Sequence, residues 1–82
     1  MARAVLYQDY NFQGRQKEVK EPISFLQDFN DVASSIVVLE GVWQLYTDAN
    51  YQNLVATLSP GVYPSVDQIG LPNDTLSSLR SI

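Results

Sequence analysis

Apolar residues occur in short runs along this chain, and turn residues separate the runs. β-Branched and aromatic residues are concentrated in these runs, and no window of about a dozen residues keeps its apolar positions at helical spacing. The pattern therefore predicts an all-β protein. The predicted strands cover residues 4–7, 16–20, 34–39, 42–46, 54–58 and 77–82, with weaker extended segments near 23–25 and 62–63.

The chain contains an internal repeat, whose two copies meet at the Glu40-Gly41 pair. Residues 7–14 (YQDYNFQG) align with residues 46–53 (YTDANYQN), and residues 30–36 (NDVASSI) align with residues 73–79 (NDTLSSL). Two copies of about 40 residues, each with about four strands, fit two Greek keys that close a β-sandwich. We therefore expect a single domain, with the first Greek key at residues 1–40 and the second at residues 41–82.

The composition limits the chemistry that is open to this domain. The 82 residues include no cysteine and no histidine, which excludes disulfides, thiolate and imidazole metal ligands, and the usual general base. A chain of this size buries a small core and commonly needs a further stabilising element. If that element is a metal ion, oxygen atoms have to bind it.

The charge balance and the apolar segments bear on possible partners. The formal net charge is −4, from nine acidic and five basic residues, whereas nucleic-acid binding needs a basic face. No stretch approaches the roughly 20 apolar residues of a membrane span, and the first residues lack the apolar core of a secretion signal. We expect a soluble protein, monomeric by itself or within a longer chain, with neither nucleic acid nor a membrane as its partner.

Both copies of the repeat carry the polar pattern Asn-Asp-x-x-Ser-Ser at the start of a predicted strand. These residue types form tight polar turns, in which side-chain and backbone oxygens can point to one place. Calcium takes about six to eight oxygen ligands from carboxylates, carbonyls, hydroxyls and water. One copy alone would most simply be a capped turn, but two copies at matching positions favour a pair of cation sites.

The aromatic hairpin and the polar turn together resemble the βγ-crystallin family. Its folded-hairpin signature is similar to Tyr7-x4-Phe12-x-Gly14, and its calcium motif, N/D-N/D-x-x-S/T-S, matches both polar turns. The resemblance covers essentially the whole chain and is strongest to the calcium-binding microbial and invertebrate members. It implies a βγ-crystallin β-sandwich of two Greek keys, which binds two calcium ions and is stabilised by them.

By this resemblance, each calcium ion is shared between the two halves of the domain. One half supplies the acid and backbone carbonyls, and the other half supplies the hydroxyl of its first motif serine. One site would take Asp31, the carbonyls of Gln8 and Val32, and Ser77, with Asn30 as a ligand or a loop-fixing residue. The other site would take Asp74, the carbonyls of Thr47 and Thr75, and Ser34, with Asn73 in the same role.

Two further expectations concern residues around these turns. Ser35 and Ser78, the last residues of the two motifs, are expected to hydrogen-bond within the fold. Asn53 stands where the first hairpin has Gly14, at a position that needs a positive φ. Asparagine is the next most tolerant residue in that conformation, so we expect the second hairpin to keep its fold with slight strain.

We expect a structural, calcium-stabilised domain and not an enzyme. Serines and carboxylates are present, but a serine nucleophile lacks a histidine or an obvious lysine base. Two alternatives remain open, namely a carbohydrate-binding or adhesion module whose loops calcium orders, and a structural protein that does not depend on calcium. Each predicted site carries about one formal negative charge, so we expect micromolar to millimolar dissociation constants.

Overall fold

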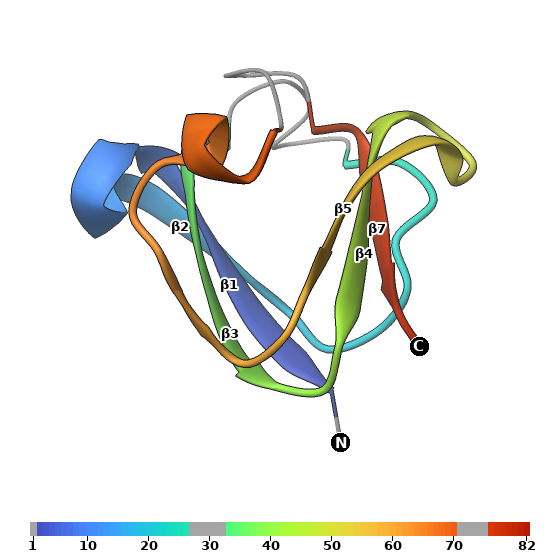
Figure 1. The fold of residues 1–82 in the computed structure, drawn as a ribbon, viewed down its shortest axis with the longest axis horizontal. Helices are drawn as coiled ribbons and strands as arrows, with labels where there is room; N and C mark the ends of the chain where they lie inside the picture. Colours follow the sequence, from blue (N-terminus) through green and yellow to red (C-terminus); the bar gives the residue numbers. More distant parts are fainter. Residues whose placement is uncertain (1, 27–32, 71–75) are drawn as a thin grey trace.

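Two antiparallel sheets form the two layers of the molecule (Figure 1). The computed structural model describes residues 2–26, 33–70 and 76–82. The first sheet has the order β2-β1-β3-β6, and the second has the order β5-β4-β7. The strand bounds are β1 (Arg3–Asp9), β2 (Gln13–Val19), β3 (Ser35–Glu40), β4 (Trp43–Asp48), β5 (Gln52–Leu58), β6 (Gly61–Tyr63) and β7 (Ser78–Ser81).

Each half of the chain contributes an extended segment to the sheet of the other half. In the first sheet, Val62 of β6 pairs with Val37 of β3. In the second sheet, Ile23 forms a bridge with Leu79 of β7, through backbone N–H to O hydrogen bonds of 2.9 and 3.1 Å. The halves are therefore interlocked, as expected for two Greek keys, and the predicted all-β sandwich is confirmed.

The core lies between the two sheets, because alternate residues of each strand point inward. Ala4 and Leu6 of β1 are fully buried, as are Leu45 of β4 and Leu79 of β7. Trp43 has no exposed surface, and its indole N–H donates a hydrogen bond to the Glu40 carbonyl at 3.2 Å. A large aromatic side chain can thus be buried at the sheet end without an unpaired polar atom.

Both β-hairpins end in a folded arch with a left-handed backbone. In the first arch, the 3-10 helix η1 (Tyr10–Phe12) has φ values of 57° at Asn11 and 62° at Phe12. The Tyr7 and Phe12 rings meet edge to face with centroids 5.6 Å apart, and the Tyr46 and Tyr51 rings of the second arch do the same at 5.7 Å. The aligned aromatic residues therefore have the same structural role in both halves.

The Asn53 position adopts the conformation that the sequence predicted. Its φ is 61°, and the corresponding Gly14 has a φ of 79°. The Asn53 side-chain amide donates a hydrogen bond to the Asp48 carboxylate. The second hairpin keeps its fold, and the asparagine side chain makes a contact that glycine cannot make.

The strand predictions differ from the structure mainly at the strand ends. β2 begins at Gln13 instead of Gln16, and β5 begins at Gln52 instead of Leu54, because each hairpin continues to its arch. The weak segment at residues 23–25 is a single bridge at Ile23. Over the part of the chain that the structure describes, no helix has the length and apolar character to cross a membrane.

Candidate metal centre

Only part of each predicted site lies among the described residues. Gln8, Ser34, Thr47 and Ser77 can be placed. The predicted ligands Asn30, Asp31, Val32, Asn73, Asp74 and Thr75 lie outside the described residues. The described residues therefore form the hydroxyl and hairpin-carbonyl side of each predicted site.

The last serine of each motif forms hydrogen bonds with the backbone of a hairpin arch. The fully buried Ser35 hydroxyl donates to the Asp9 carbonyl at 2.6 Å and accepts from the Phe12 N–H at 3.0 Å. Ser78 repeats both contacts, donating to the Asp48 carbonyl at 2.6 Å and accepting from the Tyr51 N–H at 3.1 Å. The prediction that Ser35 and Ser78 hydrogen-bond within the fold is confirmed.

Ser34 joins backbone segments from both halves of the chain. Its N–H donates to the Tyr7 carbonyl at 2.8 Å, and its carbonyl accepts from the Val66 N–H at 2.9 Å. Val66 opens the 3-10 helix η2 (Val66–Ile69), which lies shortly before the second polar turn in the sequence. Ser34 of the first motif is thus placed beside the chain that leads to the second motif.

Ser77 occupies the equivalent position in the other half. Its N–H donates to the Tyr46 carbonyl at 3.0 Å, and its carbonyl accepts from the Leu26 N–H at 2.9 Å. Leu26 lies shortly before the first polar turn in the sequence. The side chains of Ser34 and Ser77 are both buried, with 4% and 7% of their surface exposed. The two serines therefore sit in pseudo-symmetric surroundings, as the sequence repeat predicts.

One of the two hairpin residues whose carbonyls were predicted as ligands lies at an irregular point of its strand. Gln8 falls within a register shift between Tyr7 and Asp9, and it has no Cα partner in the register of β1 with β2. Such an irregular position can release a carbonyl from the ladder, which makes a backbone ligand geometrically feasible. Thr47 lies between the pairs Tyr46–Leu54 and Asp48–Gln52, whose register is regular, and the register shift of β4 with β5 falls between Leu45 and Tyr46.

The described hydrogen bonds place Gln8 and Thr47 each beside the serine of its own half. Gln8 follows Tyr7, whose carbonyl binds the Ser34 N–H, and Thr47 follows Tyr46, whose carbonyl binds the Ser77 N–H. The resemblance had grouped Gln8 with Ser77 and Thr47 with Ser34. The contacts instead bring together Gln8 with Ser34, and Thr47 with Ser77.

The chemistry of the described donors suits a hard cation. They are hydroxyl and carbonyl oxygens, which calcium prefers, and the chain has no histidine or cysteine. Within residues 2–26, 33–70 and 76–82, no group of three or more acidic side chains could hold a metal ion.

Contacts of the first arch with η2 and with Pro64 just before it were not predicted from the sequence. The Asn11 N–H donates to the Pro64 carbonyl at 3.0 Å, and the Tyr10 hydroxyl donates to the Asp67 carboxylate at 3.0 Å. The second arch has Ala49 in place of Tyr10, so the hydroxyl contact belongs to one half only. The sequence repeat could not reveal this hydroxyl contact, because Tyr10 has no tyrosine counterpart in the second copy.

Comparisons with known proteins all identify the same family. A family model described as Beta/Gamma crystallin matches residues 3–82. A beta/gamma-crystallin of Ciona intestinalis is 34% identical over 82 residues, covering 98% of each chain. The solved structure of the beta gamma crystallin from Ciona intestinalis has a TM-score of 0.94 at 33% identity, covering 98% of this chain and 99% of that one.

Two further solved structures come from microbes. A betagamma-crystallin from an archaeon has a TM-score of 0.94 at 34% identity, covering 99% of this chain and 98% of that one. A structure described as a transition-metal-ion-binding betagamma-crystallin from Methanosaeta thermophila has a TM-score of 0.84 at 35% identity, covering 95% of this chain and 98% of that one.

The curated vertebrate relatives are longer than this chain. Gamma-crystallin F of Bos taurus is 39% identical over 83 residues, which include all of this chain but 47% of the bovine protein. The chain thus spans about half the length of that relative and nearly the full length of the Ciona protein. It belongs to the beta/gamma-crystallin family, and in length it is similar to the invertebrate and archaeal members.

Proposed function

We propose that this domain is a structural module that binds two calcium ions, each shared between the two halves of the chain. The observation that carries the proposal is the position of Ser34 and Ser77. Each serine peptide hydrogen-bonds to a hairpin of its own half and to the chain that leads to the polar turn of the other half. An ion bound beside either serine would therefore bridge both halves.

The proposed ligand sets follow this geometry. One ion would be held by the Ser34 hydroxyl, the Gln8 and Thr75 carbonyls and the Asp74 carboxylate. The other would be held by the Ser77 hydroxyl, the Thr47 and Val32 carbonyls and the Asp31 carboxylate. In both sets the acid and the serine come from different halves, as the resemblance implies. The hairpin carbonyls are exchanged, so that Gln8 goes with Ser34 and Thr47 goes with Ser77. Asn30 and Asn73 would ligate directly or fix the turns.

The all-oxygen donor set favours calcium over a transition metal. The Methanosaeta thermophila neighbour is described as transition-metal-ion-binding. This chain has no histidine and no cysteine, which are the side chains that such metals usually prefer. Calcium binding to the folded state alone would stabilise it by about 2.7 kcal/mol per site at a hundredfold excess over Kd. We therefore assign the ions a structural role and propose no catalytic activity.

Isothermal titration with calcium tests the proposal directly. We expect the wild-type chain to bind two ions, and Asp31→Asn and Asp74→Asn each to bind one, because asparagine keeps the turn but removes the charge. Glu21→Gln is the matched control, since Glu21 is an exposed carboxylate outside both sets, and it should still bind two ions. Two ions bound by the Asp31→Asn/Asp74→Asn double variant would rule out these sets.

A calcium-ordered carbohydrate-binding module is the alternative that the sequence left open. Tyr10 is an exposed aromatic residue suited to stacking on a sugar, with 39% of its surface exposed. Its hydroxyl is bonded to Asp67, so its described contact serves the fold. A glycan array screened with and without calcium separates the two functions, because the structural module predicts no selective ligand.

A further inference from the structure

The outer face of the first sheet carries a cluster of apolar side chains, which we call the valine face (Val5, Val37, Leu39 and Val62). Val5 pairs with Val37, and Val37 pairs with Val62, so the three valines form one row across β1, β3 and β6. Their neighbours Ala4, Leu6, Ile36 and Val38 are buried, which shows that the valines point away from the core. Val62 is 64% exposed and Leu39 is 45% exposed.

The second sheet provides an internal comparison for this face. By the alignment of the two halves, Val5 corresponds to Gln44 and Val37 corresponds to Arg80. Gln44 and Arg80 pair with each other in the second sheet, as Val5 and Val37 do in the first. The fold accepts polar side chains at these two positions. The valines of the first sheet are therefore not required by the sandwich.

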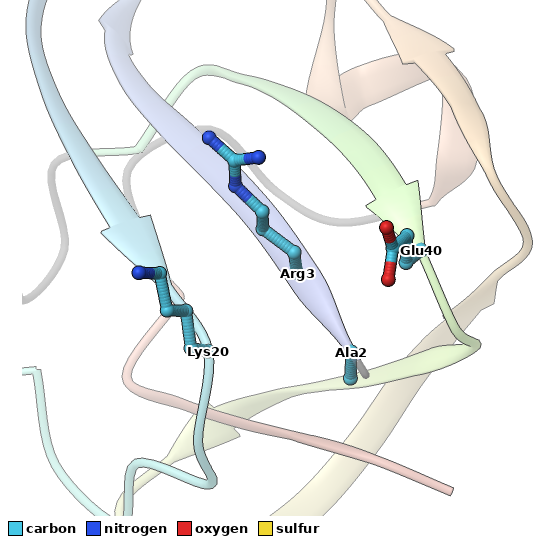
Figure 2. A pocket seen from close by; sticks show the side chains of 4 residues that line it. All are labelled: Ala2, Arg3, Lys20 and Glu40. Carbon is cyan, nitrogen blue, oxygen red and sulfur yellow. The ribbon is translucent and has the colours of Figure 1, made fainter.

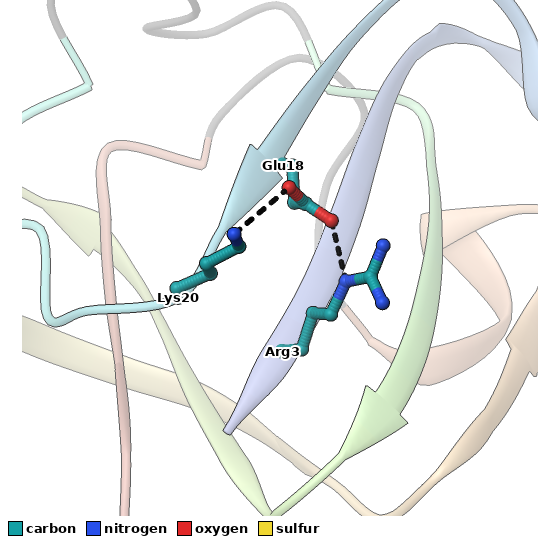
Figure 3. A network of polar contacts seen from close by, with 3 residues as sticks. All are labelled: Arg3, Glu18 and Lys20. Carbon is teal, nitrogen blue, oxygen red and sulfur yellow. Dashed lines mark hydrogen bonds and ion pairs between the residues drawn. The ribbon is translucent and has the colours of Figure 1, made fainter. Parts of the chain in front are cut away.

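Charged residues of both signs border the valine face at one end. The Arg3 guanidinium is bonded to the Glu18 carboxylate, which also lies 3.7 Å from the Lys20 ammonium (Figure 3). Arg3 pairs with Glu40 across β1 and β3, and these two residues line a hollow of about 330 Å³ with Ala2 and Lys20 (Figure 2). This rim thus carries two cations and two carboxylates, whereas the whole chain carries a net charge of −4.

We propose that the valine face binds a second copy of this chain. The face has no net charge, so two copies can meet there without the repulsion that the acidic remainder of the chain would cause. Because its rim carries both signs, a two-fold axis can bring cations of one copy to carboxylates of the other. The apolar row would then be covered by the same row of the partner.

The size of the face limits the strength of this contact. Four apolar side chains and a short charged rim are fewer than the roughly 20 residues per partner of a standard stable interface. We therefore infer a weak dimer that dissociates at micromolar concentrations and forms at millimolar concentrations. The monomer that the sequence led us to expect is accordingly the form in dilute solution.

Sedimentation velocity of the 9.2 kDa chain over a concentration series, up to about 2 mM, tests the proposal. We expect the wild-type chain to shift reversibly from monomer to dimer. Val62→Lys should raise the dimer dissociation constant at least tenfold, because it places a charge in the apolar row. Val62 lies on a short edge strand and is mostly exposed, so this substitution should not disturb the core.

Leu54→Lys is the matched control, because Leu54 is 51% exposed on β5 of the other sheet. It should change the dissociation constant less than about twofold. Adding EDTA separates this proposal from calcium binding, since the valine face contains no proposed ligand and should associate equally well without calcium. A wild-type chain that stays monomeric throughout the series, or equal effects of the two lysine substitutions, would overturn the proposal.

Discussion

At the scale of single residues, the buried hydroxyls of Ser35 and Ser78 explain why the polar turn and the aromatic hairpin occur together in each repeat. Each hydroxyl satisfies one carbonyl and one N–H of a hairpin arch. An arch with a left-handed backbone cannot satisfy those groups through a regular strand ladder. The final serine of the motif is therefore a structural residue.

Ser35→Ala should lower the free energy of unfolding by about 1–3 kcal/mol, because it leaves the Asp9 carbonyl and the Phe12 N–H without this partner. Urea denaturation followed by fluorescence of the buried Trp43 measures the loss. Ser59→Ala is the control, since Ser59 is exposed, and it should change stability by less than about 0.5 kcal/mol. Equal effects of the two substitutions would show that the Ser35 hydroxyl has no such role.

Glu18 gives a second prediction at this scale. The hydrogen bond from Arg3, together with the charges of Arg3 and Lys20, lowers the pKa of Glu18 below its ordinary value, and desolvation opposes this lowering. Its ion pairs therefore stabilise the fold above the ordinary carboxyl pKa, and this contribution is lost as the pH falls through the lowered pKa.

Carbon-detected NMR titration of the Glu18 carboxyl should show this lowered pKa, and Arg3→Gln should move the pKa upward toward the ordinary value. Because Glu18 is exposed, added salt should also raise its pKa by screening the pair. An unchanged Glu18 pKa in Arg3→Gln would contradict this interpretation.

At the scale of secondary-structure elements, the sequence predicted the strands but not the two 3-10 helices. Runs of β-branched and aromatic residues bounded by turn residues placed each strand within a few residues of its observed bounds, because such residues favour the pleated, half-buried surface of a sheet. η1 and η2 depend on contacts between distant segments, such as Asn11 with Pro64 and Ser34 with Val66. Short helices of this kind leave little periodic signal.

The sequence revealed only part of the candidate site, because the rest also depends on contacts between distant segments. The repeat identified the serines and the polar turns, since identical residues recur at matching positions. Which hairpin carbonyl lies beside which serine depends on the path of the strands, and the hydrogen bonds of Ser34 and Ser77 supplied that information. Local sequence patterns do not indicate which distant segments lie close together in the fold.

The β4–β5 hairpin yields a prediction at the element scale. Asn53→Gly relieves a positive φ but removes the amide bond to Asp48, so the free energy of unfolding should change by less than about 1 kcal/mol. Asn53→Ala should destabilise by about 1–2 kcal/mol, because alanine loses the hydrogen bond and is less tolerant of this conformation. Thermal unfolding of both variants beside the wild type measures the difference, and equal stability of the two variants would contradict it.

At the scale of the whole molecule, the fold ties its two halves together in two ways. β6 and the Ile23 bridge exchange extended segments between the sheets, and Ser34 and Ser77 join the halves near the polar turns. A domain of this size has a stability of about 5–10 kcal/mol, so two bridging ions would contribute a large share of it. Calcium would thus strengthen a connection that the strands already make.

The measurement that tests this central claim most directly is a high-resolution crystal structure of the chain grown in excess calcium. Our account predicts two ions, each about 2.3–2.6 Å from its oxygen ligands. Ser34 and Gln8 should contact one ion, and Ser77 and Thr47 should contact the other, with an acid from the opposite half on each. Polar turns without calcium, or ions bound by residues of one half alone, would contradict the account.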